Sequence, residues 1–151
     1  MPVFDTLRDR NRLTDTVVIL DIFRASNTII ELLHRGADRV AVVENLDRAR
    51  ELKSQNPDWI VLGERGGEKV AGFDGDNSPT GITEAVSGKT IALTTSGGAR
   101  CISACGSDKQ VIVGSFANAN AVLSFVRNLS SGETSFWAVG EKAEETAAED
   151  I

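Results

Sequence analysis

The chain has 151 residues, of which 41% are hydrophobic and 25% charged, and this balance is typical of one globular domain rather than of a disordered chain. Its formal net charge of −6 argues against broad electrostatic binding to nucleic acid or to anionic membranes. The sequence has no apolar run approaching the roughly 18 residues that span a bilayer, and its first residues lack the apolar core of a signal peptide. We therefore expect a single cytoplasmic domain over residues 1–151.

The expected elements begin with residues 17–20, an apolar run that is rich in β-branched residues and too short for a helix. This pattern predicts a buried strand. Residues 26–35 follow as a predicted helix, because capping residue types precede its apolar positions and Gly36 stands where a C-terminal glycine belongs. The remaining predicted elements are strands at 39–43, 59–62, 90–95, 111–113 and 134–139, helices at 46–54 and 117–129, and a short helix that ends near residue 105.

This alternation of strands and helices predicts right-handed crossovers and mostly parallel strand pairing. We therefore expect an α/β fold around a mostly parallel, or mixed, sheet of about six strands. Residues 63–88 interrupt the alternation, because they are rich in glycine and show little periodicity. A loop of this length inside a compact domain is usually functional or disordered. The tail at 141–151 is acidic and predicts the start of a helix.

Polar side chains follow the predicted strands at their carboxyl ends, where ligands bind in open α/β sheets. Carboxylates in that position suit a hard cation such as Mg²⁺, and arginines and hydroxyls suit a phosphate or another oxyanion. The combination predicts an anionic substrate that is handled with a divalent metal. The residues are Asp21 and Arg24 after the first strand, Glu64, Arg65, Asp74, Asp76, Asn77 and Ser78 after the third, Thr94, Thr95, Ser96 and Arg100 at or after the end of the fourth, and Ser115 and Asn118 after the fifth.

Other phosphate chemistries lack their sequence patterns in this chain. Asp21 has no second acid two residues later, so the D-x-D motif of enzymes that form an aspartyl phosphate is missing. The pattern G-x-x-x-x-G-K-[ST] of a P-loop is also absent. His34 is the only histidine and has no supporting motif, so we expect a plain helix residue. Cys101 and Cys105 are expected to be small buried helix residues rather than metal ligands or a disulfide.

Five segments stand in an order and spacing that resemble one known family. They are DIFRASNT at 21–28, GERGG at 63–67, GFDGDNSP at 72–79, GKTIALTTSGG at 88–98 and GSFANANAV at 114–122. The chain resembles the 2-phosphosulfolactate phosphatase (ComB) family over most of its length, and Glu149-Asp150 is similar to a later acidic motif of that family. The resemblance implies a three-layer α/β/α fold and Mg²⁺-dependent hydrolysis of a phosphate ester on a sulfonated hydroxy acid, in coenzyme M biosynthesis.

The resemblance also implies roles for individual residues and a small anionic phospho-ester as the partner. Mg²⁺ would orient the ester, stabilise charge on phosphorus and lower the pKa of an attacking water. The resemblance does not decide whether this water or a side chain is the nucleophile. The implied metal ligands are Asp21, Glu64, Asp74 and, as a further candidate, Asp150. The implied catalytic residues are Asp21, Arg24, Glu64 and Arg65, and the substrate-binding candidates are Asn77, Ser78, Thr94, Thr95, Ser96, Arg100, Ser115 and Asn118.

Two features set this chain apart from the family pattern. The fourth segment reads TTSGGAR where the family usually reads like TTTNGTR, so Gly97 and Ala99 replace hydrogen-bonding side chains. Family members also continue past the position of Ile151, so we expect a shortened family member, a fragment, or a chain to which a partner chain supplies what is missing. A non-catalytic anion-binding or assembly domain is therefore the alternative. We also expect a homo-oligomer, because a shortened sheet exposes an edge or an apolar face.

Overall fold

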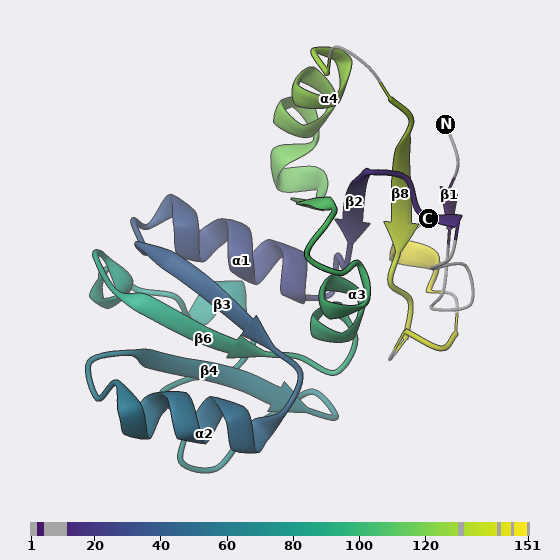
Figure 1. The fold of residues 1–151 in the computed structure, drawn as a ribbon. Helices are drawn as coiled ribbons and strands as arrows, with labels where there is room; N and C mark the ends of the chain where they lie inside the picture. Colours follow the sequence, from purple (N-terminus) through teal and green to yellow (C-terminus); the bar gives the residue numbers. More distant parts are fainter. Residues whose placement is uncertain (1–2, 5–11, 130–131, 142, 146, 151) are drawn as a thin grey trace.

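Two sheets form the framework of the computed structural model, which describes residues 3–4, 12–129, 132–141, 143–145 and 147–150. The β2 sheet has the order β1-β8-β2-β7, and all its pairs are parallel. It consists of β1 (Val3–Phe4), β2 (Thr16–Leu20), β7 (Gln110–Gly114) and β8 (Thr134–Ala138). The β6 sheet has the order β3-β6-β4-β5, in which only β5 runs antiparallel (Figure 1). It consists of β3 (Arg39–Val43), β4 (Ile60–Arg65), β5 (Glu68–Lys69) and β6 (Thr90–Thr94).

The mostly parallel α/β fold expected from the sequence is confirmed, and all six predicted strands are present. The strands belong to two sheets, whereas the sequence predicted one. Strand β2 pairs with β7 and β8, so that Thr16 lies opposite both Gln110 and Thr134. Strands β3, β4 and β6 lie between these partners in the sequence and pair with one another instead. The two short strands β1 and β5 have no counterpart in the sequence prediction.

Helices connect the strands in the described residues. The α-helices are α1 (Ala25–His34), α2 (Leu46–Gln55), α3 (Gly98–Ala104) and α4 (Ala119–Arg127). Single turns of 3₁₀ helix occur at Pro79–Gly81, Glu84–Val86, Phe116–Asn118 and Ala148–Asp150. The helices predicted from the sequence are therefore present except for the one expected at the acidic tail, where the described residues form only a 3₁₀ turn. None of the helices in these described residues is long and apolar enough to cross a membrane.

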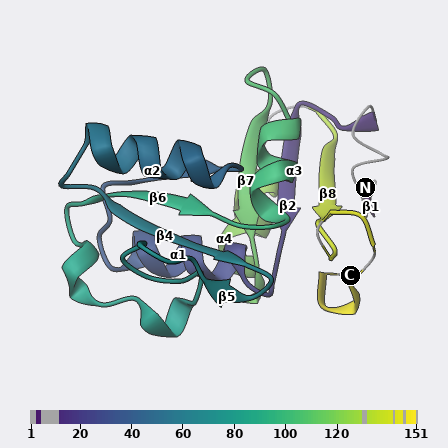
Figure 2. The ribbon, with the colours of Figure 1, turned by 90° about the horizontal axis from the view of Figure 1, so that it is seen from below.

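The β6 sheet lies between α2 on one face and α1 on the other, which gives three layers in the order α/β/α (Figure 2). Ala92 of β6 packs in one cluster with Ala49 of α2. Its neighbours Ile91 and Leu93 point to the opposite face and pack in a second cluster with Leu32 of α1. Both faces are covered, so β6 is apolar at successive positions instead of alternating with polar residues.

The β2 sheet packs one face against α3. Trp137 of β8 and Ile19 of β2 are buried in one cluster with Cys101 and Cys105. Both cysteines are free and buried, which confirms the sequence prediction. Burial raises the pKa of the Cys101 thiol to about 12 and that of Cys105 to about 11, so both stay protonated and unreactive at neutral pH. Helix α3 thereby links the loop after β6 to the β2 sheet, and this junction positions the cavity described next.

Candidate active site

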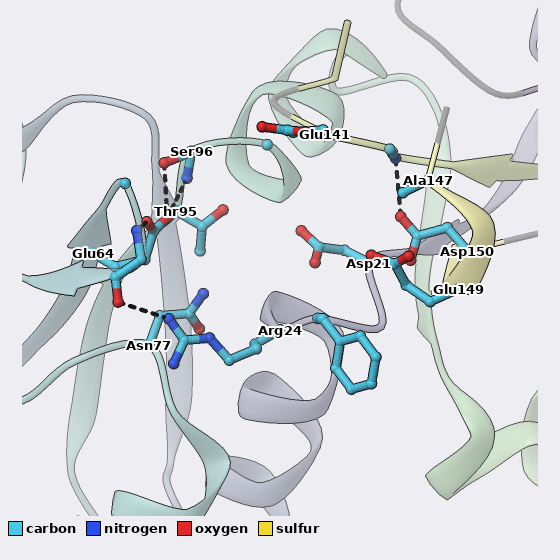
Figure 3. Close-up of a pocket in the computed structure, with 15 residues that line it drawn as sticks. Asp21, Arg24, Glu64, Asn77, Thr95, Ser96, Glu141, Ala147, Glu149 and Asp150 are labelled. Atoms are coloured by element: carbon cyan, nitrogen blue, oxygen red, sulfur yellow. Dashed lines mark hydrogen bonds between the residues drawn. The ribbon is translucent and has the colours of Figure 1, made fainter. Parts of the chain in front are cut away.

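One cavity of about 480 Å³ lies where the two sheets approach each other, at the carboxyl ends of their strands (Figure 3). Asp21 follows β2, Glu64 lies near the end of β4, and Ser96 follows β6. Ligands of open α/β proteins bind in this position, beyond the carboxyl ends of parallel strands. We call this space the acid cavity. The polar side chains that line it are Asp21, Arg24, Glu64, Asn77, Thr95, Ser96, Glu141, Glu149 and Asp150.

Asp21 comes from the β2 side of the acid cavity and is 9% exposed. Its carboxylate accepts a hydrogen bond of 3.1 Å from the backbone N–H of Ala25, which opens α1. Burial raises the pKa of Asp21 to about 6, and the negative charges of Asp150 and Glu64 add to this, while backbone N–H groups of Ala25 and Gly98 oppose it. A cation that enters the cavity would therefore stabilise the ionised form of Asp21.

Gly98 allows the close approach between α3 and Asp21. A Cβ atom at this position would lie 2.7 Å from Oδ2 of Asp21 and 3.0 Å from Cβ of Ala25. Real Cβ atoms do not come this close to other heavy atoms, so any side chain here would displace the Asp21 carboxylate or the start of α1. Only glycine lets the backbone N–H of residue 98 reach the carboxylate.

Glu64 comes from the β6 side and is 7% exposed, yet its environment is the opposite of that of Asp21. Oε1 accepts hydrogen bonds from the backbone N–H of Ser96 at 2.7 Å and from its hydroxyl at 2.8 Å. Oε2 accepts a third from the N–H of Gly67 at 2.9 Å. Burial by itself would raise the pKa of Glu64, but these three donors outweigh it and lower the pKa. Glu64 is therefore ionised at neutral pH and orders the 64–67 and 95–96 loops around it.

Asp150 closes the cavity from the tail of the chain. Its Oδ1 accepts the N–H of Ile22 at 2.8 Å and its Oδ2 accepts the N–H of Gly140 at 2.9 Å, so one carboxylate joins the ends of β2 and β8. Asp150 is 6% exposed, and burial raises its pKa. The prediction of a helix start at 141–151 is wrong for the described residues, because these contacts fold the tail back over the cavity and leave only the turn Ala148–Asp150.

Asn77 provides an unsatisfied oxygen at the same place. It is 3% exposed, and within the part of the chain that the structure describes its buried Oδ1 has no hydrogen-bond partner. An amide oxygen accepts hydrogen bonds or binds a cation, and buried polar atoms rarely stay without a partner. Asn77 also lines the acid cavity, so its side chain is a candidate for contact with a ligand that has a donor or a positive charge.

The charge of the acid cavity limits what can bind there. Among the described residues that line it, five carboxyl groups stand against the guanidinium of Arg24, which also donates a hydrogen bond of 3.1 Å to the carbonyl of Gly67. A phosphate group would be repelled by these acids unless a cation lay between them. A divalent cation would both offset this repulsion and use carboxylate and amide oxygens as ligands.

The donor set fits Mg²⁺ in the manner in which proteins commonly hold it. In the described residues, no three His, Cys, Asp or Glu side chains lie close enough to hold a metal ion together. Mg²⁺ usually keeps several waters and takes only one or two protein carboxylates together with substrate oxygens. Asp21 and Asn77 fit this role best, because the charge of Glu64 is already compensated by its three donors, whereas burial and neighbouring acids disfavour that of Asp21 and Oδ1 of Asn77 has no partner among the described residues.

The structure brings together one part of the predicted site residues. Those that line the acid cavity are Asp21, Arg24, Glu64, Asn77, Thr95, Ser96 and Asp150. Asp74 does not line it, because its carboxylate accepts the N–H of Val61 at 2.7 Å and lies 3.2 Å from the ammonium of Lys53. Asp74 therefore fastens the loop after β5 to β4, and we assign it no metal.

Other predicted residues serve the structure around the cavity. Ser115 and Asn118 form a capping box at the turn that precedes α4. The hydroxyl of Ser78 pairs with that of Thr80 at 3.0 Å. Thr94 is fully buried in β6, and its hydroxyl has no partner among the described residues. Arg65 and Arg100 line a neighbouring cavity, which they share with Thr95 and Ser96.

Some lining residues with large side chains are not among the predicted site residues. Glu141 and Glu149 belong to the acidic tail, whose high charge is a sequence signal for both, and Glu149 also belongs to the acidic motif that resembles the family's. Phe23 follows Asp21 by two positions and is 73% exposed at the edge of the acid cavity. An exposed aromatic side chain is visible as such only once the fold is known.

The fold and the acid cavity together define an α/β protein with a polar cavity at its strand ends, a common position for sites that bind small anions. The family whose model is described as 2-phosphosulpholactate phosphatase matches residues 3–151. The chain belongs to this family. The resemblance seen in the five sequence segments is thereby confirmed.

Several curated relatives carry the printed name "Probable 2-phosphosulfolactate phosphatase". The protein from Caldicellulosiruptor saccharolyticus is 38% identical over 110 residues, which cover 72% of this chain and 46% of that relative. The protein from Caldanaerobacter subterraneus subsp. tengcongensis is 36% identical over 127 residues, or 82% and 52% of the two chains. For the protein from Clostridium acetobutylicum the identity is 34% over 129 residues, or 84% and 55%. The chain thus spans about half the length of the curated relatives it matches.

Proposed function

We propose that this chain takes part in the Mg²⁺-dependent hydrolysis of the phosphate ester of 2-phosphosulfolactate or of a related small phospho-hydroxy acid. The observation that carries the proposal is the acid cavity itself. Buried carboxylates from the ends of β2 and β4 line one space, and Asn77, whose buried Oδ1 has no partner among the described residues, lines it too. The relatives' printed name, phosphatase, agrees with a site that handles phosphate with a cation.

Different side chains of the acid cavity would bind the metal ion and the phosphate group. Asp21 and Asn77 would hold Mg²⁺, which would offset the negative charge on phosphorus and lower the pKa of a bound water. The guanidinium of Arg24 lies against the carbonyl of Gly67 at the edge of the cavity and would bind the phosphate oxygens. Glu64 accepts both the N–H and the hydroxyl of Ser96, so it would hold the 95–97 segment in a fixed position beside the ligand.

The proposal is tested by phosphate release from 2-phosphosulfolactate with and without Mg²⁺. We expect release that depends on Mg²⁺ and is lost in Asp21→Asn. Asp38→Asn is the matched control, because Asp38 is exposed at the start of β3, at the opposite end of the β6 sheet from the cavity. If the wild-type chain released no phosphate but bound the ester, the alternative function of non-catalytic anion binding would replace this proposal.

We also propose that the chain associates with itself. Phe116 is 83% exposed and Leu123 39% exposed, and both line an apolar cavity of about 200 Å³ between α4 and the outer face of the β2 sheet. Exposed apolar groups around a groove commonly mark an interaction site. Light scattering during size-exclusion chromatography would show an oligomer, and Phe116→Ser should lower its mass toward that of a monomer.

A further inference from the structure

Gly97 is buried and lines the acid cavity, yet its backbone does not require a glycine. Its φ of −117° lies outside the left-handed region in which glycine is favoured. A Cβ atom at this position would meet Cγ1 of Val139 at 3.0 Å, the backbone nitrogen of Ala143 at 3.5 Å and the carbonyl oxygen of Gly140 at 3.7 Å. These nearest atoms all belong to residues 139–150, which we call the 139–150 segment. The missing side chain at position 97 therefore makes room for this segment.

Val139 and Ala143 hold the 139–150 segment against the core. Val139 is fully buried, and its backbone N–H donates to the carbonyl of Leu20 at 2.9 Å. Ala143 is 1% exposed and packs with Val139 in the cluster around Trp137. The φ of Ala143 is 61°, which residues other than glycine rarely adopt, so the packing holds the chain in an unfavourable conformation. A segment packed this closely has little space for a side chain at position 97.

Gly140 connects this packing to Asp21. The N–H of Gly140 donates to Oδ2 of Asp150 at 2.9 Å, and Oδ1 of Asp150 accepts the N–H of Ile22 at 2.8 Å (Figure 3). Ile22 directly follows Asp21, so the carboxylate of Asp150 joins the 139–150 segment to the backbone beside the proposed Mg²⁺ ligand. A displacement of Gly140 would therefore also act on the position of Asp21.

We infer that Gly97 is a positioning residue of the acid cavity and acts on Asp21 through the 139–150 segment. The inference rests on the proposed function, which assigns a cation to Asp21. Without a side chain at position 97, Gly140 lies where its N–H reaches Asp150, and Asp150 fixes the backbone next to Asp21. A side chain at this position would push Gly140 away from the 95–97 loop and release the carboxylate of Asp150 from this donor.

Amide hydrogen exchange of the full chain, followed by NMR, tests whether Gly97 holds the segment in place. Gly97→Val adds a branched side chain where a Cβ alone would already meet Val139. We expect the N–H groups of Gly140 and Ile22 to exchange about tenfold faster than in the wild type, because local opening exposes both of them. The N–H of Leu93 in β6 should keep its rate, whereas a general loss of stability would raise the rates of all three groups.

Gly97→Ala and Gly81→Val complete the exchange experiment. Gly97→Ala should raise the exchange rate of Gly140 in the same direction but by less, since only the Cβ contact is added. Gly81→Val is the matched control, because a Cβ there would meet only Oδ1 of Asp76 at 3.7 Å, and it should leave the exchange of Gly140 unchanged. Unchanged exchange of Gly140 in Gly97→Val would overturn the inference.

Calorimetric titration with Mg²⁺ tests the link to Asp21. Gly97→Val and Asp150→Asn should each weaken Mg²⁺ binding about tenfold, and the double variant should be no weaker than the weaker single variant, because both changes break the same link. Effects that multiply in the double variant, or wild-type affinity for Mg²⁺ in Gly97→Val, would overturn the inference. If the wild type bound no Mg²⁺, the proposed function would fail, whereas the exchange rates would still decide whether Gly97 positions the 139–150 segment.

Discussion

Asp21 and Glu64 face one cavity from two sheets, and the comparison between them explains how the site works. The two carboxyl groups are buried to nearly the same extent, at 9% and 7% exposure. Glu64 receives three hydrogen bonds and its pKa is lowered, whereas burial and neighbouring acids raise the pKa of Asp21 to about 6. On the β6 side of the cavity, hydrogen bonds therefore compensate the negative charge of Glu64. The β2 side lacks a positive charge, which a bound cation would supply.

The largest effect should follow from the loss of the Asp21 charge. We expect Asp21→Asn to lower Mg²⁺-dependent phosphate release by about 10²- to 10³-fold, because a cation that stabilises a phosphoryl transfer contributes several kcal/mol. The measurement is kcat/KM for 2-phosphosulfolactate, with Asp38→Asn as the control. Activity within about threefold of the wild type in Asp21→Asn would remove Asp21 from the site.

Glu64→Gln should mainly lower the stability of the fold. A glutamine can still accept from Ser96, but its amide N–H would face the N–H of Gly67, which loses its charged acceptor. We expect a loss of about 1–3 kcal/mol in the free energy of unfolding. Urea denaturation measures it, with Glu68→Gln, an exposed residue of β5, as the matched control. Equal stability of the two variants would show that the hydrogen bonds to Glu64 are not needed.

Gly98→Ala tests the contact that brings α3 against Asp21. The added Cβ would lie 2.7 Å from the Asp21 carboxylate, so we expect kcat/KM to fall about tenfold or more, since small displacements at a reacting centre are costly. Gly81→Ala is the matched control, because its Cβ would meet only Oδ1 of Asp76 at 3.7 Å, an ordinary contact. Full activity of Gly98→Ala would mean that the position of the Asp21 carboxylate is not critical.

The smallest effect concerns the pH dependence of stability without Mg²⁺. The folded pKa of Asp21 is about 6 against 3.8 unfolded, so the unfolded chain releases this proton first and stability falls as the pH rises from about 4 to about 6. Asp21→Asn should remove this fall and be more stable than the wild type by about 1–2 kcal/mol at pH 7.

Glu64 has a lowered pKa, so its contribution should change in the opposite direction and be lost as the pH falls below about 4.5. Denaturation of both variants across pH 3–8 therefore separates the two sides of the cavity. If the stability difference between Asp21→Asn and the wild type were the same at pH 4 and pH 7, the environment proposed for Asp21 would be wrong.

Local sequence patterns predicted the elements well but not the way they assemble. Apolar runs such as residues 17–20 mark buried strands, and the acid that follows each run identified Asp21 and Glu64 correctly as cavity residues. The pairing of Thr16 with Gln110 joins distant parts of the chain, so the division into two sheets was not visible from either segment alone.

The same distinction separates the predicted residues that line the acid cavity from those that do not. The position of Asp150 depends on hydrogen bonds to Ile22 and Gly140, which exist only after the tail folds back. Asp74 has the residue type and sequence context of a ligand, yet its carboxylate is engaged by Val61 and Lys53. The residue type at a strand end predicts which side chains can line the cavity. Local hydrogen bonds determine which of these side chains do line it.

Binding of Mg²⁺ is the most direct test, because a cation beside Asp21 would compensate the negative charge on that side of the cavity. Thermal unfolding at increasing Mg²⁺ concentration measures this binding, since a ligand of the folded state raises the unfolding temperature. We predict that Mg²⁺ stabilises the wild type and Asp38→Asn but not Asp21→Asn. An equal rise in unfolding temperature for Asp21→Asn would contradict the central claim.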